Sequence, residues 1–332
     1  MKVLVTGAAG MIGRKFCQRL AADGAIAGRK ISALHMMDVI AAGDLPGAAF
    51  AVYSEAGDIS DRNLAPRLIA DRPDLVVHLA AIVSGEAEMD FDKGYAVNLD
   101  GTRHLFDAIR TENIVSGGQY RPRVLFSSSI AVFGAPFPES IPDEFHLTPL
   151  TSYGAQKAAG ELLLADFTRK GFFDGVGLRF PTICVRPGRP NAAASGFFSN
   201  IIREPLAGQK AILPVPETVR HTHATPRAAV GFLLHAATLD GEKIGPRRNL
   251  SMPGVCVTVG EQIEALRKVA GATAVALIER RPDEAIARIV SGWPERFEAR
   301  RARELGFAAE SSFEEIVRAH IADELDRKTA QG

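Results

Sequence analysis

The segment that most constrains the fold of this chain is its first thirteen residues. Lys2–Val5 is a short apolar run, typical of a buried strand, and it leads directly into the glycine-rich turn Thr6–Gly13. Apolar residues after the turn recur at the spacing of one helix face. A strand, a glycine-rich turn and a helix in this order begin a doubly wound parallel sheet that binds a dinucleotide, whereas a glycine-rich turn alone would need no ligand.

The three glycines of this turn have separate expected roles. Gly7 permits the tight exit from the strand, Gly10 lets the backbone approach a pyrophosphate, and Gly13 lets the helix pack closely on the sheet. The backbone N–H groups of Met11 and Ile12, at the start of the helix, are expected to face the phosphates. The spacing is GxxGxxG instead of the more common GxGxxG.

An acidic residue marks the end of the next predicted strand, Ile31–Asp38. Asp38 lies 25 residues after Gly13, near the offset at which a carboxylate binds the adenosine ribose hydroxyls and repels a 2′-phosphate. Because Val39 follows, and not an arginine, the sequence predicts NAD in preference to NADP. The alternative is that Asp38 only caps the turn after its strand.

A second motif supplies groups for acid–base chemistry. Tyr153 and Lys157 stand four residues apart in a predicted helix, and Ser129 lies 24 residues before Tyr153. Residues four apart share a helix face, so a fixed positive charge on Lys157 would lower the phenol pKa from its usual value of about 10 and make Tyr153 a base. Ser129 would hold the same substrate hydroxyl. Alone, such a pair is more often a solvated patch.

These motifs occur with others in an order that resembles one family. Over nearly its whole length, and most clearly from residue 1 to about 183, the chain is similar to the extended short-chain dehydrogenases/reductases of the NAD-dependent epimerase/dehydratase superfamily. The segments that carry the resemblance are Thr6–Gly13, Asp58–Ile59, His78–Ala81, Ser128–Gly134 and Tyr153–Lys157. Their combination is far more specific than any one of them, and His78 alone indicates a structural histidine.

The resemblance implies cofactor contacts beyond the glycine loop. Asp58 and Ile59 would contact the adenine, Asn98 would stabilise the central helix and its ordered water, and Lys157 would also bond the nicotinamide ribose. The other residues expected to line the cofactor are Leu79, Ala80, Ala81, Tyr153, Pro181 and Ile183.

The remaining chain alternates predicted strands and helices, as in a Rossmann-type doubly wound parallel sheet with a smaller α/β substrate-binding lobe at the C-terminal end. We expect the NAD-binding domain over residues 1–180, with returns around 220–248, and the lobe over residues 181–219 and 249–330. The further predicted strands are Ala49–Tyr53, Leu75–Leu79, Val124–Ser128 and Val176–Phe180.

Two long helices are expected, over Tyr95–Arg110 and Ser152–Lys170. In the resembling family these helices pack against their copies in a four-helix interface, which implies a homodimer. Small residues such as Ala155 and Ala158 suit close packing. The alternative is that they face the core of their own subunit.

Composition argues against several classes of protein. The 332 residues carry 39 basic and 39 acidic side chains, which does not favour general binding of nucleic acid or anionic membranes. Three dispersed cysteines predict a reducing compartment without disulfides, and no metal-binding motif is present. No run of about 20 apolar residues could span a bilayer. We therefore expect a cytoplasmic protein without a metal site.

Departures from the family pattern narrow the reaction. Dehydratases of this family carry Asp-Glu directly after the catalytic serine or threonine, but here the positions are Ile130 and Ala131, which cannot transfer a proton. Phe133 stands where the family usually has tyrosine, and Arg220–His223 is not followed by the aspartate of nucleotide-sugar enzymes. These differences disfavour a dehydratase and weaken the case for a nucleotide-sugar.

The compact, arginine-bearing segment after Phe180 suggests a small hydroxy acid, because guanidinium grips carboxylates. Within the family the chain resembles most the D-erythronate dehydrogenase group, in which the 2-hydroxyl of a four-carbon sugar acid is oxidised and hydride passes to nicotinamide C4. The residues expected to bind the acid are Ser84, Ser129, Tyr153, Thr182, Arg186, Asn191 and Arg220. For each arginine a surface ion pair is the alternative.

Two other functions remain compatible with these motifs. An NAD-dependent nucleotide-sugar 4-epimerase would retain its cofactor and release no NADH. A non-catalytic dinucleotide sensor would bind NAD and a protein partner, but such sensors commonly lack the Tyr153 and Lys157 pair.

Overall fold

The computed structural model describes residues 1–188 and 195–326, and the contacts within it divide the chain into two units, which we treat separately. Of the described residues, unit 1 comprises 1–132, 147–180 and 230–251, and unit 2 comprises 133–146, 181–188, 195–229 and 252–326. Across the described ranges, none of the helices is long and apolar enough to span a membrane.

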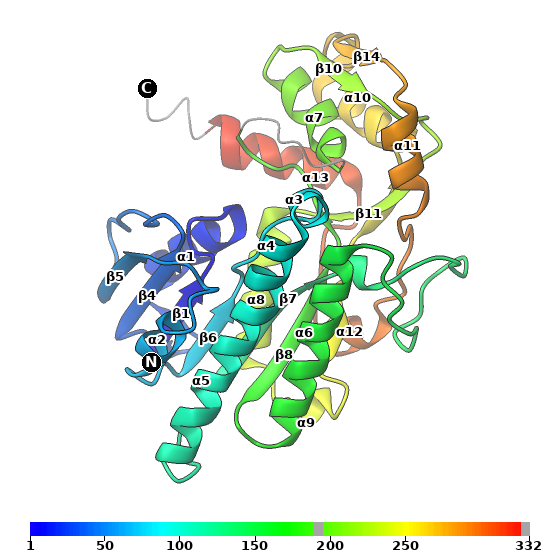
Figure 1. Ribbon diagram of the computed structural model, residues 1–332. Helices are drawn as coiled ribbons and strands as arrows, with labels where there is room; N and C mark the ends of the chain where they lie inside the picture. The colour runs from blue at the N-terminus through cyan, green and yellow to red at the C-terminus, as the bar shows by residue number, and fades with distance from the viewer. Residues whose placement is uncertain (189–194, 327–332) are drawn as a thin grey trace. The chain divides into compact units, whose positions relative to one another are not determined.

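Unit 1 is built on a seven-stranded sheet with the order β12-β8-β7-β6-β1-β4-β5, in which all neighbours are parallel (Figure 1). The order reverses between β1 and β6, and ligands of such sheets bind outside the carboxyl ends of the strands at this point. This topology confirms the predicted Rossmann-type fold. The strands are β1 (Lys2–Thr6), β4 (Ala33–Asp38), β5 (Ala51–Ala56), β6 (Leu75–His78), β7 (Arg123–Ser129), β8 (Asp174–Phe180) and β12 (Asn249–Ser251).

Helices connect most of these parallel strands, whereas residues 39–50 join β4 to β5 without a helix. A short hairpin of β2 (Ala25–Ile26) and β3 (Arg29–Lys30) follows the first helix. The helix α8 (Pro226–Thr238) begins in unit 2 and continues into unit 1. The other helices of unit 1 are α1 (Met11–Asp23), α2 (Leu64–Ile69), α3 (Ser84–Met89), α4 (Phe91–Tyr95), α5 (Gly101–Val115), α6 (Ser152–Arg169) and α9 (Gly241–Ile244).

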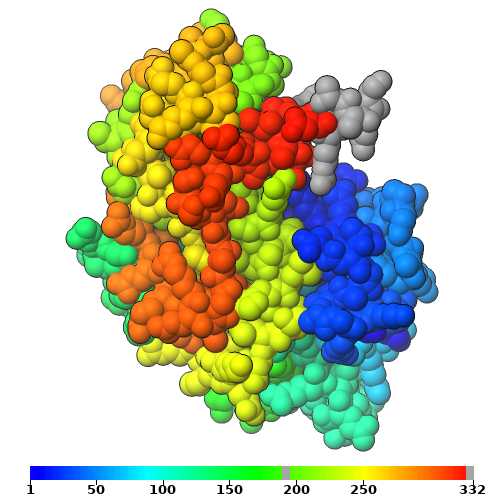
Figure 2. Space-filling view, turned by 180° about the vertical axis from the view of Figure 1, so that it is seen from behind, coloured from blue at the N-terminus to red at the C-terminus, as the bar shows by residue number. Residues whose placement is uncertain are grey.

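The strand β8 shows how the two faces of the sheet are covered. Its odd-numbered residues face α6, since a Cβ on Gly175 would lie 2.9 Å from Leu164 and Arg179 bonds Glu161. Phe180 points to the opposite face and stacks on Phe232 of α8, with ring centroids 6.3 Å apart. Figure 2 shows this second face, with α1 in blue and the yellow-green surface of α8 beside it.

Unit 2 contains two small sheets and a core of helices. β11 pairs with β9 in parallel and with β13 in antiparallel, and β10 pairs with β14. Its apolar core is built from α7, α10 and α13 and includes Phe198, Leu266 and Ile316. The elements are β9 (Thr182–Ile183), α7 (Gly196–Leu206), β10 (Ala211–Leu213), β11 (Arg220–Ala224), β13 (Val255–Thr258), α10 (Val259–Val275), β14 (Ile278–Arg280), α11 (Glu284–Ser291), α12 (Arg300–Glu304) and α13 (Phe313–His320), followed by a π-helical turn Ile321–Leu325.

The unit boundaries differ from the domain limits expected from the sequence at three places. Residues 133–146 belong to unit 2, because Phe133 packs on Phe297 at 5.8 Å and Ile141 bridges the same residue. Residues 220–224 form β11 of unit 2 and do not return to the large sheet. In contrast, Asn249–Ser251 pairs in parallel with β8 and completes the sheet of unit 1.

The first long helix also differs from its prediction over Tyr95–Arg110. The structure has α4 up to Tyr95, a π-helical turn over Ala96–Asp100, and then α5 up to Val115. The hydroxyl of Thr102, in the first turn of α5, donates to the carbonyl of Asn98 in the π-helical turn at 2.7 Å. A π-helical turn is a local widening that helical periodicity does not reveal, and it often occurs at functional sites.

We predict opposite effects for two Gly→Ala substitutions in helices of unit 1. A Cβ on Gly13 would lie 2.2 Å from the carbonyl oxygen of Gly7, so Gly13→Ala forces the backbone apart and should cost about 1–3 kcal/mol. Gly231 of α8 is exposed, and a Cβ there would meet no atom within 4 Å, so Gly231→Ala should stabilise by up to about 1 kcal/mol. Chemical denaturation measures both, and equal effects would contradict the packing described.

Candidate active site

The glycine loop between β1 and α1 has the geometry expected of a pyrophosphate cradle. Gly7 adopts φ +76°, and a Cβ there would lie 2.5 Å from the backbone nitrogen of Ala80. Gly10 forms the exposed N-cap of α1 without a side-chain cap. The first N–H groups of α1, at Met11 and Ile12, therefore begin a helix end that no side chain of Gly10 covers, and such an end favours an anion. These residues fit a dinucleotide.

Asp38 lies at the end of β4 beside this loop. Its Oδ2 accepts a hydrogen bond from the Ala9 nitrogen at 2.9 Å, and its Oδ1 accepts one from Val39 at 2.7 Å. The carboxylate is half-buried, and each of its oxygens retains a further lone pair. It is thus fixed in orientation and can accept from ribose hydroxyls.

The predicted adenine contacts differ from one another in burial. Asp58 is exposed, and its Oδ1 accepts from the nitrogen and the hydroxyl of Ser60 at 2.9 and 2.7 Å. Ile59 is only 3% exposed, and its side chain packs against Gly101 at the start of α5. The side chain of Ile59 therefore belongs to the core, and a contact with adenine would fall to its backbone.

His78 at the end of β6 is a structural residue, as its sequence context suggested. The Thr102 hydroxyl donates its only proton to the Asn98 carbonyl. Its oxygen therefore accepts a hydrogen bond from His78 Nε2 at 2.9 Å. His78 Nδ1 then accepts from Thr6 Oγ1 at 2.6 Å. Burial, with the nearby Lys157 charge, lowers the pKa of His78 to about 3, so the ring is neutral.

Residues Leu79 to Ala81 continue from β6 along the carboxyl edge of the sheet and are half-buried. The Leu79 nitrogen donates to the Thr6 carbonyl at 3.0 Å, which places this segment beside the glycine loop. Ser84 is exposed at the start of α3.

Asn98 is fully buried in the π-helical turn, and its side-chain amide links two other segments. Its Oδ1 accepts from the Ile82 nitrogen at 2.9 Å, and its Nδ2 donates to the Ile82 carbonyl at 3.3 Å and to Gln156 Oε1 at 2.7 Å. Its amide thus joins the segment after β6 to α6. This agrees with a stabilising role for Asn98 and leaves its two amide protons already used.

The start of α6 lies against the segment that follows β7. Thr151 caps α6 by accepting from Gly154 at 3.1 Å. A Cβ on Gly154 would lie 2.2 Å from the carbonyl oxygen of Ala131, two residues after Ser129. Ser129 itself is half-buried, and its Oγ accepts from the Ala131 nitrogen at 3.1 Å. The close approach at Gly154 therefore holds Tyr153 next to the segment that follows Ser129.

Lys157 lies one turn further along α6 and is 2% exposed. Its Nζ donates to the Ser127 carbonyl at 2.8 Å and lies 5.0 Å from the centre of the Phe126 ring and 5.7 Å from that of Tyr153. Burial lowers the pKa of Lys157 from 10.5 to about 7. The sequence led us to expect a fixed positive charge on Lys157. Instead, this charge varies with pH near neutrality.

A buried ion pair near Lys157 was not predicted from the sequence. Arg179 of β8 donates to both carboxylate oxygens of Glu161, from Nε at 2.8 Å and from Nη2 at 2.7 Å. Ser128 Oγ donates to Glu161 Oε1 at 2.5 Å. Glu161 stands four residues after Lys157 on α6, but its partners lie on two strands, so only the structure reveals the cluster.

The predicted substrate residues of unit 2 have well-defined contacts of their own. Thr182 Oγ1 lies 2.7 Å from His221 Nε2. Arg186 contacts the Ile183 carbonyl and Ser195 Oγ at 3.3 Å each, and Arg220 lies 3.7 Å from Glu261. Both guanidinium groups thus have partners within unit 2. Pro181 and Ile183 are buried, and Asn191 lies outside the described residues.

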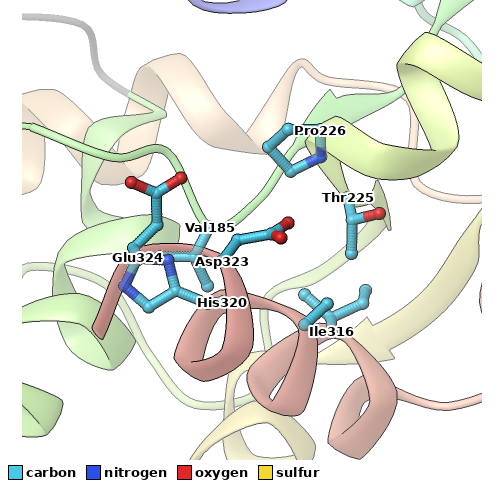
Figure 3. A pocket seen from close by; sticks show the side chains of 8 residues that line it. Val185, Thr225, Pro226, Ile316, His320, Asp323 and Glu324 are labelled. Atoms are coloured by element: carbon cyan, nitrogen blue, oxygen red, sulfur yellow. The ribbon is translucent and has the colours of Figure 1, made fainter. Parts of the chain in front are cut away.

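A pocket in unit 2 lies between α13 and the segment Thr225–Pro226 (Figure 3). Its lining includes Val185, His320 and Asp323, and none of the predicted site residues is among its eight lining residues. Within residues 1–188 and 195–326, no group of three or more His, Cys, Asp or Glu side chains could hold a metal ion.

Comparison with known proteins places these features in one family. The model of the NAD dependent epimerase/dehydratase family matches residues 3–224. The D-erythronate dehydrogenase of Cupriavidus necator is 43% identical over 97% of this chain and 98% of that protein. The D-erythronate dehydrogenase of Haemophilus influenzae is 37% identical over 97% of this chain and 99% of that protein.

Solved structures agree on the fold. A nucleoside-diphosphate-sugar epimerase from Agrobacterium tumefaciens shares 64% identity with a TM-score of 0.96, over 98% of this chain and 95% of that chain. An L-threonine dehydrogenase from Cupriavidus necator, at 22% identity, has a TM-score of 0.82 over 97% of this chain and 99% of that chain. The second likeness shows the fold alone.

The buried Lys157 predicts a pH-dependent stability of the cofactor-free protein. The pKa of Lys157 is about 7 when folded and near 10.5 when unfolded, so between these values the unfolded chain binds more protons. The free energy of unfolding should rise with pH in this window, by up to about 1.4 kcal/mol per pH unit. Below pH 7 Lys157 is charged in the folded protein, so the full cost of burying its ammonium group is present there. Lys157→Met should therefore be more stable than wild type at pH 6, with the advantage shrinking toward pH 10.

Denaturation of both proteins across this pH range measures the effect. Lys243→Met, at an exposed lysine of α9, provides the matched control and should follow the wild-type curve. Parallel curves for wild type and Lys157→Met would show that burial does not lower the pKa of Lys157.

Proposed function

The chain belongs to the NAD-dependent epimerase/dehydratase family, and from this we propose that it oxidises the 2-hydroxyl of D-erythronate to the 2-oxo acid. At the coarser level it is an NAD-dependent sugar-acid dehydrogenase. The observation that carries the proposal is its similarity, over nearly the full length of both proteins, to D-erythronate dehydrogenases of two organisms.

The proximity of α6 to the end of β7 supports the catalytic roles that we propose. Tyr153 takes the proton of the substrate 2-hydroxyl, and Ser129 holds the hydroxyl oxygen. Lys157, charged over part of the neutral pH range, favours the phenolate of Tyr153 through its proximity. Bound NAD supplies the acceptor for the hydride that leaves C2. The buried ion pair of Glu161 and Arg179, together with Ser128, ties α6 to β7 and β8.

The cofactor-binding roles are divided along the carboxyl edge of the sheet. Gly7, Gly10 and the N-terminus of α1 would hold the pyrophosphate, and Asp38 would hold the adenosine ribose. Asp38 would also repel a 2′-phosphate, which is the basis for the proposed preference for NAD over NADP. On the substrate side, Ser84, Thr182, Arg186 and Arg220 would contact the hydroxyls and carboxylate of the acid.

A nucleotide-sugar 4-epimerase is the second candidate, because the Agrobacterium tumefaciens protein at 64% identity is described as a nucleoside-diphosphate-sugar epimerase. An epimerase returns the hydride to its substrate and releases no NADH. A non-catalytic sensor is disfavoured by the Tyr153 and Lys157 pair.

We also propose a homodimer that forms through α5 and α6. Each helix carries exposed apolar side chains: Ile114 and Val115 on α5 are 57% and 70% exposed, and Leu162 on α6 is 67% exposed. Burial of such side chains favours association.

Turnover with a panel of four- to six-carbon aldonic and uronic acids tests the proposed reaction. We expect NADH to form fastest with D-erythronate at neutral to mildly alkaline pH. If no acid is oxidised, and NAD is found bound to the purified protein, the 4-epimerase becomes the better account.

Tyr153→Phe should lower turnover by about 10²-fold or more while NAD binding survives, because only the proton acceptor is removed. Tyr120→Phe removes the same atom at a buried site, where the hydroxyl donates to the Pro73 carbonyl at 3.1 Å, and should leave turnover near the wild-type value. Full activity of Tyr153→Phe would exclude Tyr153 as the base.

Asp38→Ala should relax the preference for NAD over NADP, because it removes the charge that repels the 2′-phosphate. The ratio of kcat/KM for the two cofactors measures this, and Asp44→Ala, at an exposed aspartate beyond β4, serves as the control. An unchanged ratio would leave Asp38 with a structural role only.

A further inference from the structure

The inference concerns a histidine of unit 2 that stands behind Thr182. His221 of β11 is 2% exposed. Its ring is stacked on Phe198 of α7, with centroids 5.2 Å apart and the planes within 3° of parallel. Trp293 lies against it at 5.7 Å. These aromatic neighbours exclude water from the ring and fix its plane.

His221 is neutral in these surroundings and so carries a single ring proton. Burial lowers its pKa to about 4, well below neutral pH. One nitrogen of a neutral imidazole then donates a hydrogen bond, and the other accepts one. The position of this proton decides what its hydrogen-bond partners can do.

The backbone of Pro294 locates the proton. Proline has no N–H, so its hydrogen bond with His221 uses the Pro294 carbonyl, and His221 must be the donor. Nε2 faces Thr182, which leaves Nδ1 as the nitrogen that donates to Pro294. The neighbouring peptide is held in place, because Thr222 Oγ1 donates to the Glu295 carbonyl at 2.6 Å.

The direction of the bond between Thr182 and His221 follows. With the proton on Nδ1, Nε2 has only a lone pair, so the Thr182 hydroxyl donates its one proton across the 2.7 Å separation. Thr182 is half-buried, and its oxygen retains two lone pairs and no proton for any other partner.

We propose that His221 is a positioning residue that makes Thr182 an obligatory hydrogen-bond acceptor, so that Thr182 binds a hydroxyl of the sugar acid and not its carboxylate. This rests on the proposed function for the placement of Thr182 at the substrate. A carboxylate has no proton to give and would meet a second acceptor, whereas a hydroxyl can donate. The carboxylate is therefore left to positive groups such as Arg186 or Arg220.

The tautomer is measured directly by NMR of protein labelled with ¹⁵N in its histidine rings, without substrate or turnover. We expect one ring with the proton on Nδ1 and unchanged shifts between pH 6 and 9. Its signal should vanish in His221→Phe, which retains the stacking on Phe198; His221→Gln provides a second assignment variant. A proton on Nε2, or a ring charged at pH 6, would overturn the proposal.

Substrate analogues test the consequence for binding. Acids that lack the C3 or the C4 hydroxyl should have a lower kcat/KM than D-erythronate. For the acid that lacks the hydroxyl bound by Thr182, the loss in wild type should be about ten-fold, chiefly through a higher KM. In Thr182→Val that loss should largely disappear, because no acceptor is left unpaired. Thr238→Val, at an exposed threonine near the end of α8, should discriminate as wild type does.

The outcomes separate this inference from the proposed function. If Thr182→Val discriminates as strongly as wild type, Thr182 does not bind a substrate hydroxyl and the inference fails, although D-erythronate is still oxidised. If wild type oxidises no sugar acid, the proposed function fails and the substrate role of Thr182 fails with it. The NMR result then still decides the tautomer.

Discussion

The hydrogen bond from Lys157 to the Ser127 carbonyl is the interaction on which the candidate site depends. It holds an ammonium group in a buried position, which costs free energy because one hydrogen bond to a neutral carbonyl only partly replaces the lost hydration. Two contacts keep the surrounding elements together: α6 approaches the segment after β7 closely at Gly154, and Glu161 joins Ser128 of β7 to Arg179 of β8. The cost appears as a lysine pKa of about 7, which makes the charge beside Tyr153 responsive to pH near neutrality.

The parts of this site that could be predicted from the sequence are those encoded by local spacing. The strand, glycine turn and helix at the N-terminus, Asp38 at a strand end, and the four-residue step from Tyr153 to Lys157 are each contained in one segment, and the fold they predict is confirmed. The buried partnership of Glu161 with Arg179 joins residues on different elements and has no local signature. The pKa of Lys157 depends on burial, which the spacing alone does not give.

The boundaries of the units show the same limitation. Asn249–Ser251 was expected in the substrate-binding lobe, and only its pairing with β8 reveals that it completes the large sheet. Residues 133–146 follow a strand of unit 1 but pack on Phe297 of unit 2. Such long-range pairings join segments that are far apart in the sequence. This is why the cofactor loop was easier to recognise than the residues that select the acid, and why one fold can host several reactions.

Transfer of isotope from C2 tests the central claim most directly. D-erythronate with deuterium at C2 should reduce NAD more slowly than the unlabelled acid, and the deuterium should be recovered at C4 of the reduced nicotinamide. Deuterium placed at C3 should stay in the sugar acid. Unlabelled NADH formed from the C2-deuterated acid, or label transferred from C3, would contradict oxidation of the 2-hydroxyl by this site.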